Sequence, residues 1–276
     1  MSEFNITSKL FNVKNKNIVI TGSAGLLGSQ FTSTLTKAGA NVILVDVNES
    51  GNKKLAKSLS KYNPKIKYYK TDISIPAQVK NLKKLLKEDF SQIDGLVNNA
   101  AYTTKGSIRD SSSKHALPFE KFSFEHWEKS LQINLTGVFL CSQQIGDIMV
   151  KQKQGVIVNI SSIYGLVGAD QRIYGKNGIN VPVSYAATKG SIINLTRYLA
   201  AYWHQKNIRV NSLSLGGVID KKYQDKNFIK KYSEKTILGR MANKTDFDGS
   251  LLFLLSDASS YMTGSNLVVD GGWTAW

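Results

Sequence analysis

The sequence predicts one α/β domain with a doubly wound, seven-stranded parallel sheet and helices on both of its faces. Short β-branched runs alternate with amphipathic stretches along all 276 residues, which is the pattern of a parallel sheet buried on both sides. No linker or internal repeat interrupts this alternation, so residues 1–276 are expected to form a single domain. The expected strands are Ile18–Thr21, Asn41–Asp46, Ile66–Thr71, Ile93–Asn98, Gly155–Ile160, Ile208–Leu213 and Leu267–Val269.

Helices are expected in the stretches between these strands. A glycine turn leads into the first helix, which runs to about Lys37 and ends at Ala38-Gly39-Ala40. The others, with approximate bounds, are Lys53–Ser60, Pro76–Leu86, Phe124–Val150, Ser184–Lys206 and Lys244–Leu255. Parallel sheets bind ligands at the carboxyl ends of their strands, and each motif below lies at such an end or on a helix that begins there.

The composition gives a net charge of +16, from 36 Lys and Arg against 20 Asp and Glu. Eleven lysines lie between Lys53 and Lys87, mostly in helix-like stretches with few aromatic residues among them. This distribution favours solvated helix faces over a nucleic-acid interface, and no metal-ligand spacing occurs. Steering of an anionic substrate is an alternative use of the charge.

The lone cysteine, Cys141, cannot form an internal disulfide, and its apolar helical surroundings predict a buried thiol. Lysines at 9, 14 and 16 interrupt the N-terminal region, and no apolar stretch approaches the length of a membrane span. The sequence therefore indicates a cytoplasmic protein that binds neither membrane nor nucleic acid.

A glycine-rich turn, TGSAGLLG at Thr21–Gly28, joins the first strand to the first helix. Gly22 lets the chain turn, Gly25 permits close approach of a phosphate, and Gly28 lets helix and strand pack closely. The helix N-terminus then offers amide donors and a positive dipole to a pyrophosphate. A mere tight turn is the alternative for the motif taken alone.

Asp46 strengthens the nucleotide interpretation, because it ends the second strand eighteen residues after Gly28. A carboxylate there accepts hydrogen bonds from an adenosine ribose and repels a 2′-phosphate. No lysine or arginine lies within the glycine turn to offset that repulsion. NAD(H) is therefore favoured over NADP(H).

Two further strand ends carry candidate cofactor contacts. Asp72 follows the third strand and could accept from an adenine amino group, or it could serve only as an acid ahead of the helix at Pro76. Asn98-Asn99-Ala100 ends the fourth strand, where paired asparagines can tie strand ends together and leave room for a cofactor. A simple turn is the alternative there.

The candidate catalytic groups lie between Val158 and Lys189. Ser161 and Ser162 end the fifth strand, and Tyr185 and Lys189 are four residues apart on one face of a predicted helix. A neighbouring ammonium favours the phenolate and lowers the tyrosine pKa, while a serine hydroxyl can hold a carbonyl or alcohol oxygen. A second Tyr-x-x-x-Lys pair, at 202 and 206, lies late in the same helix and is interpreted as packing.

Asn134, in INLTG on the long helix, is an amide at a position where the helical period calls for an apolar residue. Its side chain could hold a water behind Lys189 and complete a proton path. A polar residue that only distorts the helix is the alternative.

These motifs resemble the short-chain dehydrogenase/reductase family. The glycine turn, the strand-end Asp46, NNA, INLTG, VNISS, SYAATKG, IRVNSLSLGG and SSYMTGSNLVVDGG follow the family's order and spacing across essentially the whole chain. The resemblance implies a Rossmann fold, an oxidoreductase that acts on CH–OH groups with NAD or NADP, and a homodimer or homotetramer.

The resemblance also implies roles for four residues: Tyr185 as acid/base, Ser162 orienting the substrate oxygen, Lys189 binding nicotinamide ribose, and Asn134 supporting a relay water. The expected cofactor-binding residues are Gly22, Ser23, Gly25, Leu26, Leu27, Gly28, Asp46, Val47, Asp72, Ile73, Asn98, Asn99, Ala100, Tyr185, Lys189 and Val218.

Three positions depart from the family pattern. Leu26 stands where a glycine is usual, since the glycine falls at Gly25, a spacing more typical of the extended, sugar-nucleotide-modifying branch. Leu215-Gly216 replaces the usual Pro-Gly, and Asp220 stands in place of a common threonine.

Two stretches, at about 101–120 and 165–184, are longer than is usual in the family and flank the catalytic residues. Long loops next to a site are often functional. Their polar and basic residues suggest a polar, sugar-like substrate that could be phosphorylated. The candidate substrate contacts are Tyr102, Arg109, Tyr164, Arg172 and Tyr174.

The sequence thus predicts an NAD-dependent oxidoreductase that interconverts a secondary alcohol and a ketone on a sugar, sugar phosphate or nucleotide-sugar derivative. The wording SSIYG and VPVSYAA also resembles a bacterial branch linked to flagellin modification and surface-sugar biosynthesis. One alternative is a reductase of 3-oxoacyl or other small ketones, for which apolar loops would be expected. Another is an NAD-binding regulatory subunit without turnover.

Overall fold

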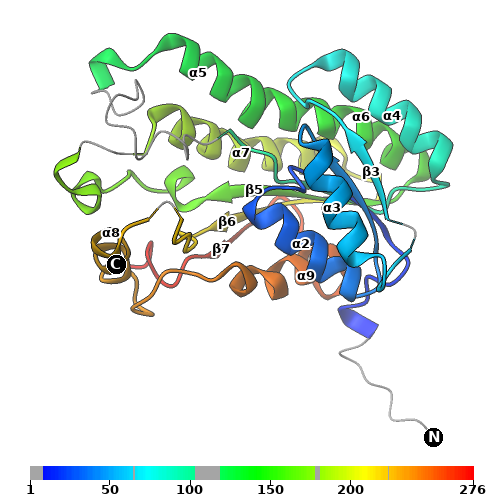
Figure 1. Ribbon diagram of the computed structural model, residues 1–276. Helices are drawn as coiled ribbons and strands as arrows, with labels where there is room; N and C mark the ends of the chain where they lie inside the picture. The colour runs from blue at the N-terminus through cyan, green and yellow to red at the C-terminus, as the bar shows by residue number, and fades with distance from the viewer. Residues whose placement is uncertain (1–8, 65, 103–118, 178–180, 223) are drawn as a thin grey trace, which may run out of the picture.

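A seven-stranded, all-parallel sheet forms the centre of the protein (Figure 1). The computed structural model describes residues 9–64, 66–102, 119–177, 181–222 and 224–276. The strand order is β3-β2-β1-β4-β5-β6-β7, so the direction of winding reverses between β1 and β4. The strands are β1 Asn17–Thr21, β2 Asn41–Asp46, β3 Lys67–Lys70, β4 Gly95–Asn98, β5 Gly155–Ser162, β6 Ile208–Leu215 and β7 Asn266–Val269. The predicted Rossmann-type, single-domain architecture and all seven predicted strands are confirmed.

Helices cover both faces of the sheet. Their bounds are α2 Leu26–Lys37, α3 Glu49–Leu59, α4 Pro76–Asp89, α5 Phe124–Leu131, α6 Gly137–Gln152, α7 Val183–Tyr202, α8 Lys226–Ser233 and α9 Asp248–Leu255. Helices α4, α6 and α7 lie on one side of the sheet, whereas α2 and α9 lie on the other (Figure 1). Successive side chains of a strand point to opposite faces of the sheet, so β1 contributes to the hydrophobic core on each side. Val19 packs in the core beneath α4, α6 and α7, whereas Ile18 and Ile20 pack in the core beneath α2 and α9.

The long helix predicted over Phe124–Val150 is interrupted in the structure. A π-helical turn over Gln132–Thr136 separates α5 from α6. The apolar period runs through both parts, so hydrophobic pattern alone could not reveal the break. Asn134, within that turn, is 1% exposed and is held by bonds to neighbouring segments.

Three other helical segments differ from the prediction. Helix α3 begins at Glu49 because the Asn48 side chain caps it by accepting from Gly51 N at 3.0 Å. Helix α8 was not predicted, although Asp225 caps it by accepting from Phe228 N at 2.8 Å. A 3-10 segment, Gln171–Asn177, also lies within a stretch predicted to be irregular.

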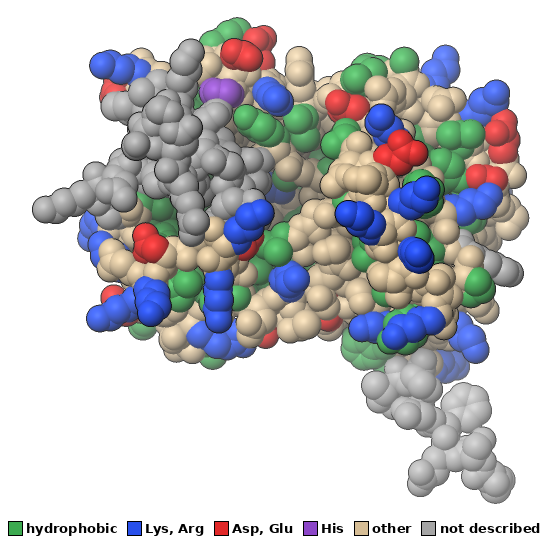
Figure 2. Space-filling view, in the orientation of Figure 1, with side chains coloured by type: hydrophobic (Ala, Val, Ile, Leu, Met, Phe, Trp, Pro, Cys, Tyr) green, Lys and Arg blue, Asp and Glu red, His purple; other side chains and the backbone are tan. Residues whose placement is uncertain are grey.

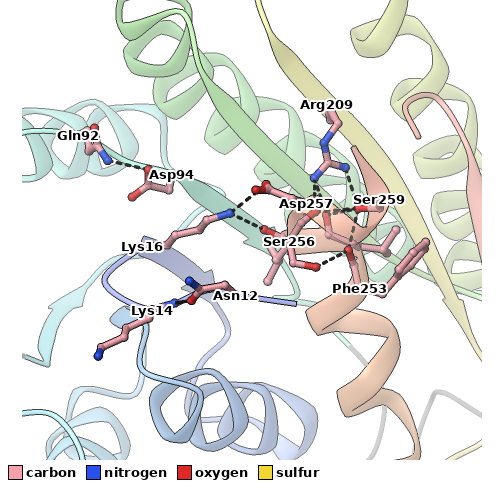
Figure 3. Close-up of polar contacts among 12 residues, drawn as sticks. Asn12, Lys14, Lys16, Gln92, Asp94, Arg209, Phe253, Ser256, Asp257 and Ser259 are labelled. Carbon is pink, nitrogen blue, oxygen red and sulfur yellow. Dashed lines mark hydrogen bonds and ion pairs between the residues drawn. The ribbon is translucent and has the colours of Figure 1, made fainter. Parts of the chain in front are cut away.

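Two basic side chains stabilise the C-terminal end of α9 (Figure 3). Arg209 donates to the carbonyls of Leu254 and Ser256 at 3.1 and 3.0 Å. Lys16 donates to the carbonyl of Leu255 at 3.4 Å and pairs with Asp257 at 3.6 Å. Cations favour the negative end of the helix dipole and satisfy its last carbonyls, so α9 is fixed against the sheet there.

Lysine and arginine side chains are spread over the face of the molecule shown in Figure 2 rather than gathered into one patch. Several are paired, including Lys67 with Asp89 and Lys83 with Asp147. Cys141 is fully buried, as expected, and burial raises the pKa of its thiol to about 12. Among the described helices, none has both the length and the apolar character needed to span a membrane.

Candidate active site

A cavity of about 800 Å³ opens at the carboxyl ends of the strands, around the point where the winding reverses. It brings together the last residues of β2, β5 and β6, the segments that follow β1, β3 and β4, and the start of α7. The predicted residues that line it are Gly22, Gly25, Leu26, Leu27, Gly28, Asp46, Val47, Asp72, Ile73, Asn99, Ala100, Tyr102, Ser162, Tyr164, Tyr174, Tyr185, Lys189 and Val218. The chemical motifs of the sequence therefore share one site.

The glycine turn packs its backbone too closely for side chains. Gly22 has φ +65°, and a Cβ there would lie 2.6 Å from Ala100 Cα. A Cβ on Gly28 would lie 2.0 Å from the Gly22 carbonyl oxygen. Gly25 is the N-cap of α2, and no side chain caps that helix. The first amides of α2 are thus left to a ligand in the cavity, which is the arrangement that a pyrophosphate requires.

Asp46 lies beside this turn at the end of β2. Its carboxylate accepts from Ala24 N at 3.0 Å and from Asn48 N at 2.9 Å. These bonds fix the carboxylate at the cavity wall and keep an acidic group there. Together with the uncapped helix and the glycine backbone, Asp46 fits an adenine dinucleotide.

The asparagine pair and Asp72 have distinct structural roles. Asn98 donates to Ser142 Oγ and Asn159 Oδ1 at 3.1 and 2.8 Å, behind the cavity wall, so it ties β4 to its neighbours. Asn99 donates to the Gly22 carbonyl at 3.1 Å and holds the glycine turn. Asp72 accepts from both the amide and the hydroxyl of Ser74 through one oxygen and also lines the cavity. Ser23 is buried and donates to Asn52.

The two serines at the end of β5 face different partners. Ser161 Oγ donates to the Lys189 carbonyl at 2.8 Å and thereby joins β5 to α7. Ser162 Oγ accepts from Tyr164 N at 3.3 Å, and its hydroxyl lowers the pKa of Tyr185. Ser162, rather than Ser161, is therefore the serine available to a substrate oxygen beside Tyr185.

Tyr185 is partly accessible from the cavity but surrounded by protein, and burial raises its pKa, with a smaller lowering from Ser162. That direction is opposite to the one expected from the lysine alone. Lys189 Nζ lies 5.6 Å from the Tyr185 ring centroid and donates to the Ile160 carbonyl at 2.7 Å. Burial lowers the pKa of Lys189 to about 8, because its surroundings disfavour the ammonium.

Asn134 uses its side-chain amide to connect three segments. Its Oδ1 accepts from Tyr102 N at 2.6 Å, and its Nδ2 donates to the Tyr102 carbonyl at 3.2 Å and to Thr188 Oγ1 at 3.4 Å. Both amide hydrogens thus have protein partners. The side chain positions the cavity wall at Tyr102 and the helix residue next to Lys189.

The substrate end of the cavity is walled by aromatic residues. The hydroxyls of Tyr164 and Tyr174 lie 3.1 Å apart, and burial raises the pKa of both. Arg172 does not line the cavity: its side chain is 82% exposed and pairs with Asp170 at 2.8 Å. Arg109 lies outside the described residues.

Helix α8 and the two residues before it add wall residues that were not predicted, namely Gln224, Asp225 and Phe228. The Phe228 ring centroid lies 5.3 Å from that of Tyr174. The available signal was the spacing of Asp225 and Phe228, which suits a helix cap three residues before an apolar residue.

The loop after β6 is fixed by backbone hydrogen bonds, although Leu215 stands where the family usually has a proline. Ile219 N donates to the Ala242 carbonyl at 2.8 Å, and Ala242 N donates to the Gly217 carbonyl at 3.0 Å, so Val218 pairs with Ala242 as a parallel bridge. At the position where the family often has a threonine, Asp220 N donates to Gln224 Oε1 at 2.8 Å.

The fold and this site define an oxidoreductase of the Rossmann type, and sequence comparison identifies the family. Residues 22–274 match the family model described as enoyl-(acyl carrier protein) reductase. Three curated relatives are similar over nearly the whole chain. Sorbose reductase of Candida albicans is 31% identical, covering 96% of this chain and 89% of its own. Cyclopentanol dehydrogenase of Comamonas testosteroni is 31% identical, with coverage of 95% and 98%.

Post-translational flagellin modification protein A of Campylobacter coli is 30% identical, with coverage of 95% and 99%. A short-chain dehydrogenase of Leptospira borgpetersenii with bound NAD+ superimposes with a TM-score of 0.84 at 33% identity, covering 99% and 97% of the two chains. A gluconate 5-dehydrogenase of Burkholderia cenocepacia, in complex with NADP and tartrate, superimposes with a TM-score of 0.85 at 27% identity, covering 98% of this chain and 99% of its own. The chain belongs to the short-chain dehydrogenase/reductase family and is an oxidoreductase that acts on CH–OH groups.

Proposed function

We propose that the protein is an NAD(H)-dependent oxidoreductase that interconverts a secondary alcohol and a ketone on a sugar or sugar derivative. The observation that carries this proposal is the shared cavity: Tyr185, Lys189 and Ser162 face the same space as the glycine turn and Asp46. When bound, NAD(H) accepts or supplies the hydride.

The chain's own residues would handle the oxygen and its proton. Ser162, held by Tyr164 N, donates to or accepts from the substrate oxygen, while Tyr185 passes the proton. Lys189 places a positive charge near Tyr185 whenever it is protonated, which favours loss of the phenol proton. The predicted roles of Ser162, Tyr185 and Lys189 are retained in this proposal. Asn134, whose amide hydrogens both have protein partners, is instead proposed to position Tyr102.

The preference for NAD(H) is supported by Asp46. Its carboxylate is fixed at the cavity wall, and the glycine turn from Gly22 to Gly28 contains no basic side chain. A 2′-phosphate there would meet a negative charge. The test is a thermal-shift titration with NAD and NADP. Stronger stabilisation by NADP would refute the preference.

An uncharged, hydroxylated substrate is supported by the described wall of the cavity. One hydroxyl of the Tyr164–Tyr174 pair donates its hydrogen to the other. The second hydroxyl hydrogen and the remaining lone pairs are left to bond a substrate hydroxyl. Arg172 and Lys235 both bind Asp170, so neither presents a free charge to an anion. Among the described wall residues, tyrosine and phenylalanine thus favour a neutral sugar or polyol over a sugar phosphate. We propose that the two long stretches, at about 101–120 and 165–184, contribute to this end of the site through Tyr102 and Tyr174, which line the cavity. Residues 103–118 and 178–180 of these stretches lie outside the described residues.

The decisive experiment follows reduced-cofactor absorbance with neutral polyols and ketoses, sugar phosphates, nucleotide sugars and a 3-oxoacyl thioester. Turnover of neutral polyols above the phosphorylated panel supports the proposal. A preference for the thioester would favour the ketoreductase alternative, and cofactor binding without turnover of any compound would favour a regulatory subunit. Tyr174→Phe should reduce kcat/KM about tenfold for a polyol, because one substrate hydrogen bond is lost. Arg172→Ala should change kcat/KM little for any of these substrates.

We also propose that the protein assembles as a homodimer or homotetramer. Tyr198 and Tyr202 on α7 are 62% and 65% exposed and stack on one another, which supports an apolar contact surface on this helix. Sedimentation analysis tests the proposal. A monomer at micromolar concentration would refute it.

A further inference from the structure

The loop after β6 forms one wall of the cavity through Gly216, Gly217 and Val218. On the side away from the cavity, Tyr232 of α8 supports it. Gly217 N donates to the Tyr232 hydroxyl at 2.5 Å. A Cβ on Gly217 would lie 2.4 Å from Tyr232 Cζ, so the ring packs directly against the loop backbone. Only glycine leaves room for this contact.

Tyr232 is itself firmly anchored. It is 2% exposed, and its ring stacks on Trp273 with a centroid distance of 4.3 Å and an interplanar angle of 27°. Trp273 lies in a C-terminal turn that Asp270 holds by accepting from Thr274 N and Oγ1 at 2.9 and 2.7 Å. Tyr232 is therefore held in place by the C-terminal turn, and it in turn holds the loop through Gly217.

Without the tyrosine hydroxyl, the loop has space in which to move. A second cavity of about 200 Å³ lies behind it, lined by Gly216, Gly217, Tyr232 and Leu238 among others. The Ala242 bridge holds the Gly217 carbonyl, but the Gly217 amide depends on Tyr232. Loss of this one acceptor would leave that amide unpaired in a partly buried place.

Helix α8 also reaches the other end of the site. Phe228, four residues before Tyr232, lines the main cavity and packs near Tyr174. The Phe228 and Tyr232 ring centroids are 5.9 Å apart. One face of α8 thus contributes Phe228 to the aromatic wall of the main cavity and Tyr232 to the support of the loop.

We propose that Tyr232 is a positioning residue, which fixes the Gly216–Val218 loop in the conformation in which it lines the cavity proposed to bind the cofactor. This proposal rests on the proposed binding of NAD(H). Tyr232 does not line the main cavity, so it acts through Gly217 rather than by touching the cofactor.

The test is Tyr232→Phe, which removes the acceptor and keeps the ring that stacks on Trp273. Tyr261→Phe is the matched control, because Tyr261 is fully exposed. We expect Tyr232→Phe to raise the Kd for NADH about tenfold and the control to change it less than about twofold. Hydrogen–deuterium exchange of the free protein should be faster in peptides that cover Gly216–Val218.

Gly217→Ala provides a second, independent variant, because its Cβ would displace the Tyr232 ring. Gly249→Ala is its control, since a Cβ there meets nothing within 4 Å. Gly217→Ala should also weaken NADH binding at least about tenfold, and the double variant should be much less than additive. Binding is measured below the melting temperature of every variant.

Failure of the positioning role and failure of the proposed function are distinguishable. An unchanged Kd in Tyr232→Phe, with wild-type protein that binds NADH, would overturn the positioning role and leave the proposed function intact. A wild-type protein that binds neither NADH nor NADPH would overturn the proposed function and this inference with it. A lower melting temperature with unchanged Kd would show a merely structural tyrosine.

Discussion

Lys189 Nζ donates a 2.7 Å hydrogen bond to the main-chain carbonyl of Ile160, just before the serine pair. Ser161 Oγ returns a bond to the Lys189 carbonyl at 2.8 Å. Strand β5 and helix α7 are therefore joined in both directions at the point where the chemistry is expected. These two bonds fix Ser162 relative to Tyr185 independently of the long stretch at 165–184 that connects them in the sequence.

Replacement of Tyr185 by phenylalanine tests the proton-transfer role. We expect kcat to fall by about 10²–10⁴-fold, because a positioned acid/base contributes on that scale. NADH binding should survive, since the ring remains. Tyr202→Phe is the matched control: it removes the other Tyr-x-x-x-Lys hydroxyl, on a side chain that is 65% exposed. Unchanged turnover in Tyr185→Phe, measured by cofactor absorbance, would contradict the mechanism.

Lys189→Met should stabilise the protein while abolishing most of its activity. Burial lowers the Lys189 pKa from 10.5 to about 8, so at pH 7 the folded protein holds a disfavoured charge. The variant removes that cost but leaves the Ile160 carbonyl without this donor. We expect a net gain in the free energy of unfolding of roughly 1–3 kcal/mol at pH 7.

The gain should depend on pH in a defined direction. Between pH 8 and 10.5 the unfolded chain keeps a proton that folded Lys189 has lost, so the wild-type protein recovers stability as pH rises through that window. The difference in the free energy of unfolding between variant and wild type should therefore be largest below pH 8 and smallest near pH 10.5. Urea unfolding of both proteins at pH 7 and pH 10 measures it. A variant less stable than wild type at pH 7 would show that the lysine is not costly.

Asp46→Asn should reduce discrimination against NADP. The amide keeps one of the two backbone acceptors, so either Ala24 N or Asn48 N loses its partner. It also removes the negative charge that a 2′-phosphate would meet. We expect the ratio of the NADP and NAD dissociation constants to fall about tenfold. Asp72→Asn is the control, because it removes another cavity carboxylate and should change the ratio less than about threefold. Equal ratios in wild type and Asp46→Asn would refute the assignment.

Motifs at strand ends could be predicted because a parallel sheet brings those ends to one edge, whatever the loops do. Asp46 and Ser162 were found in this way, whereas Tyr185 was found from its four-residue spacing to Lys189 on one helix face. The outward direction of Arg172 could not be predicted, since it depends on Asp170 two residues earlier and Lys235 on another element. Nor could the support of Gly217 by Tyr232, which joins residues whose sequence context gives no periodic signal.

Asn134→Ala tests whether the buried amide positions the site through Tyr102. The variant removes the acceptor of Tyr102 N and the donor to its carbonyl, so we expect a loss of about 2–4 kcal/mol in the free energy of unfolding. Turnover should fall at least about tenfold, because Tyr102 lines the cavity and would lose its fixed position.

Thr188→Val separates the two connections that Asn134 makes. It removes the hydroxyl that receives the longer Asn134 bond, at 3.4 Å, and leaves both bonds to Tyr102 in place. If Tyr102 is what Asn134 positions, kcat in Thr188→Val should stay within about threefold of wild type, while Asn134→Ala loses far more. Equal losses of kcat in the two variants would instead locate the effect in α7, beside Lys189, and would contradict the role assigned to Tyr102.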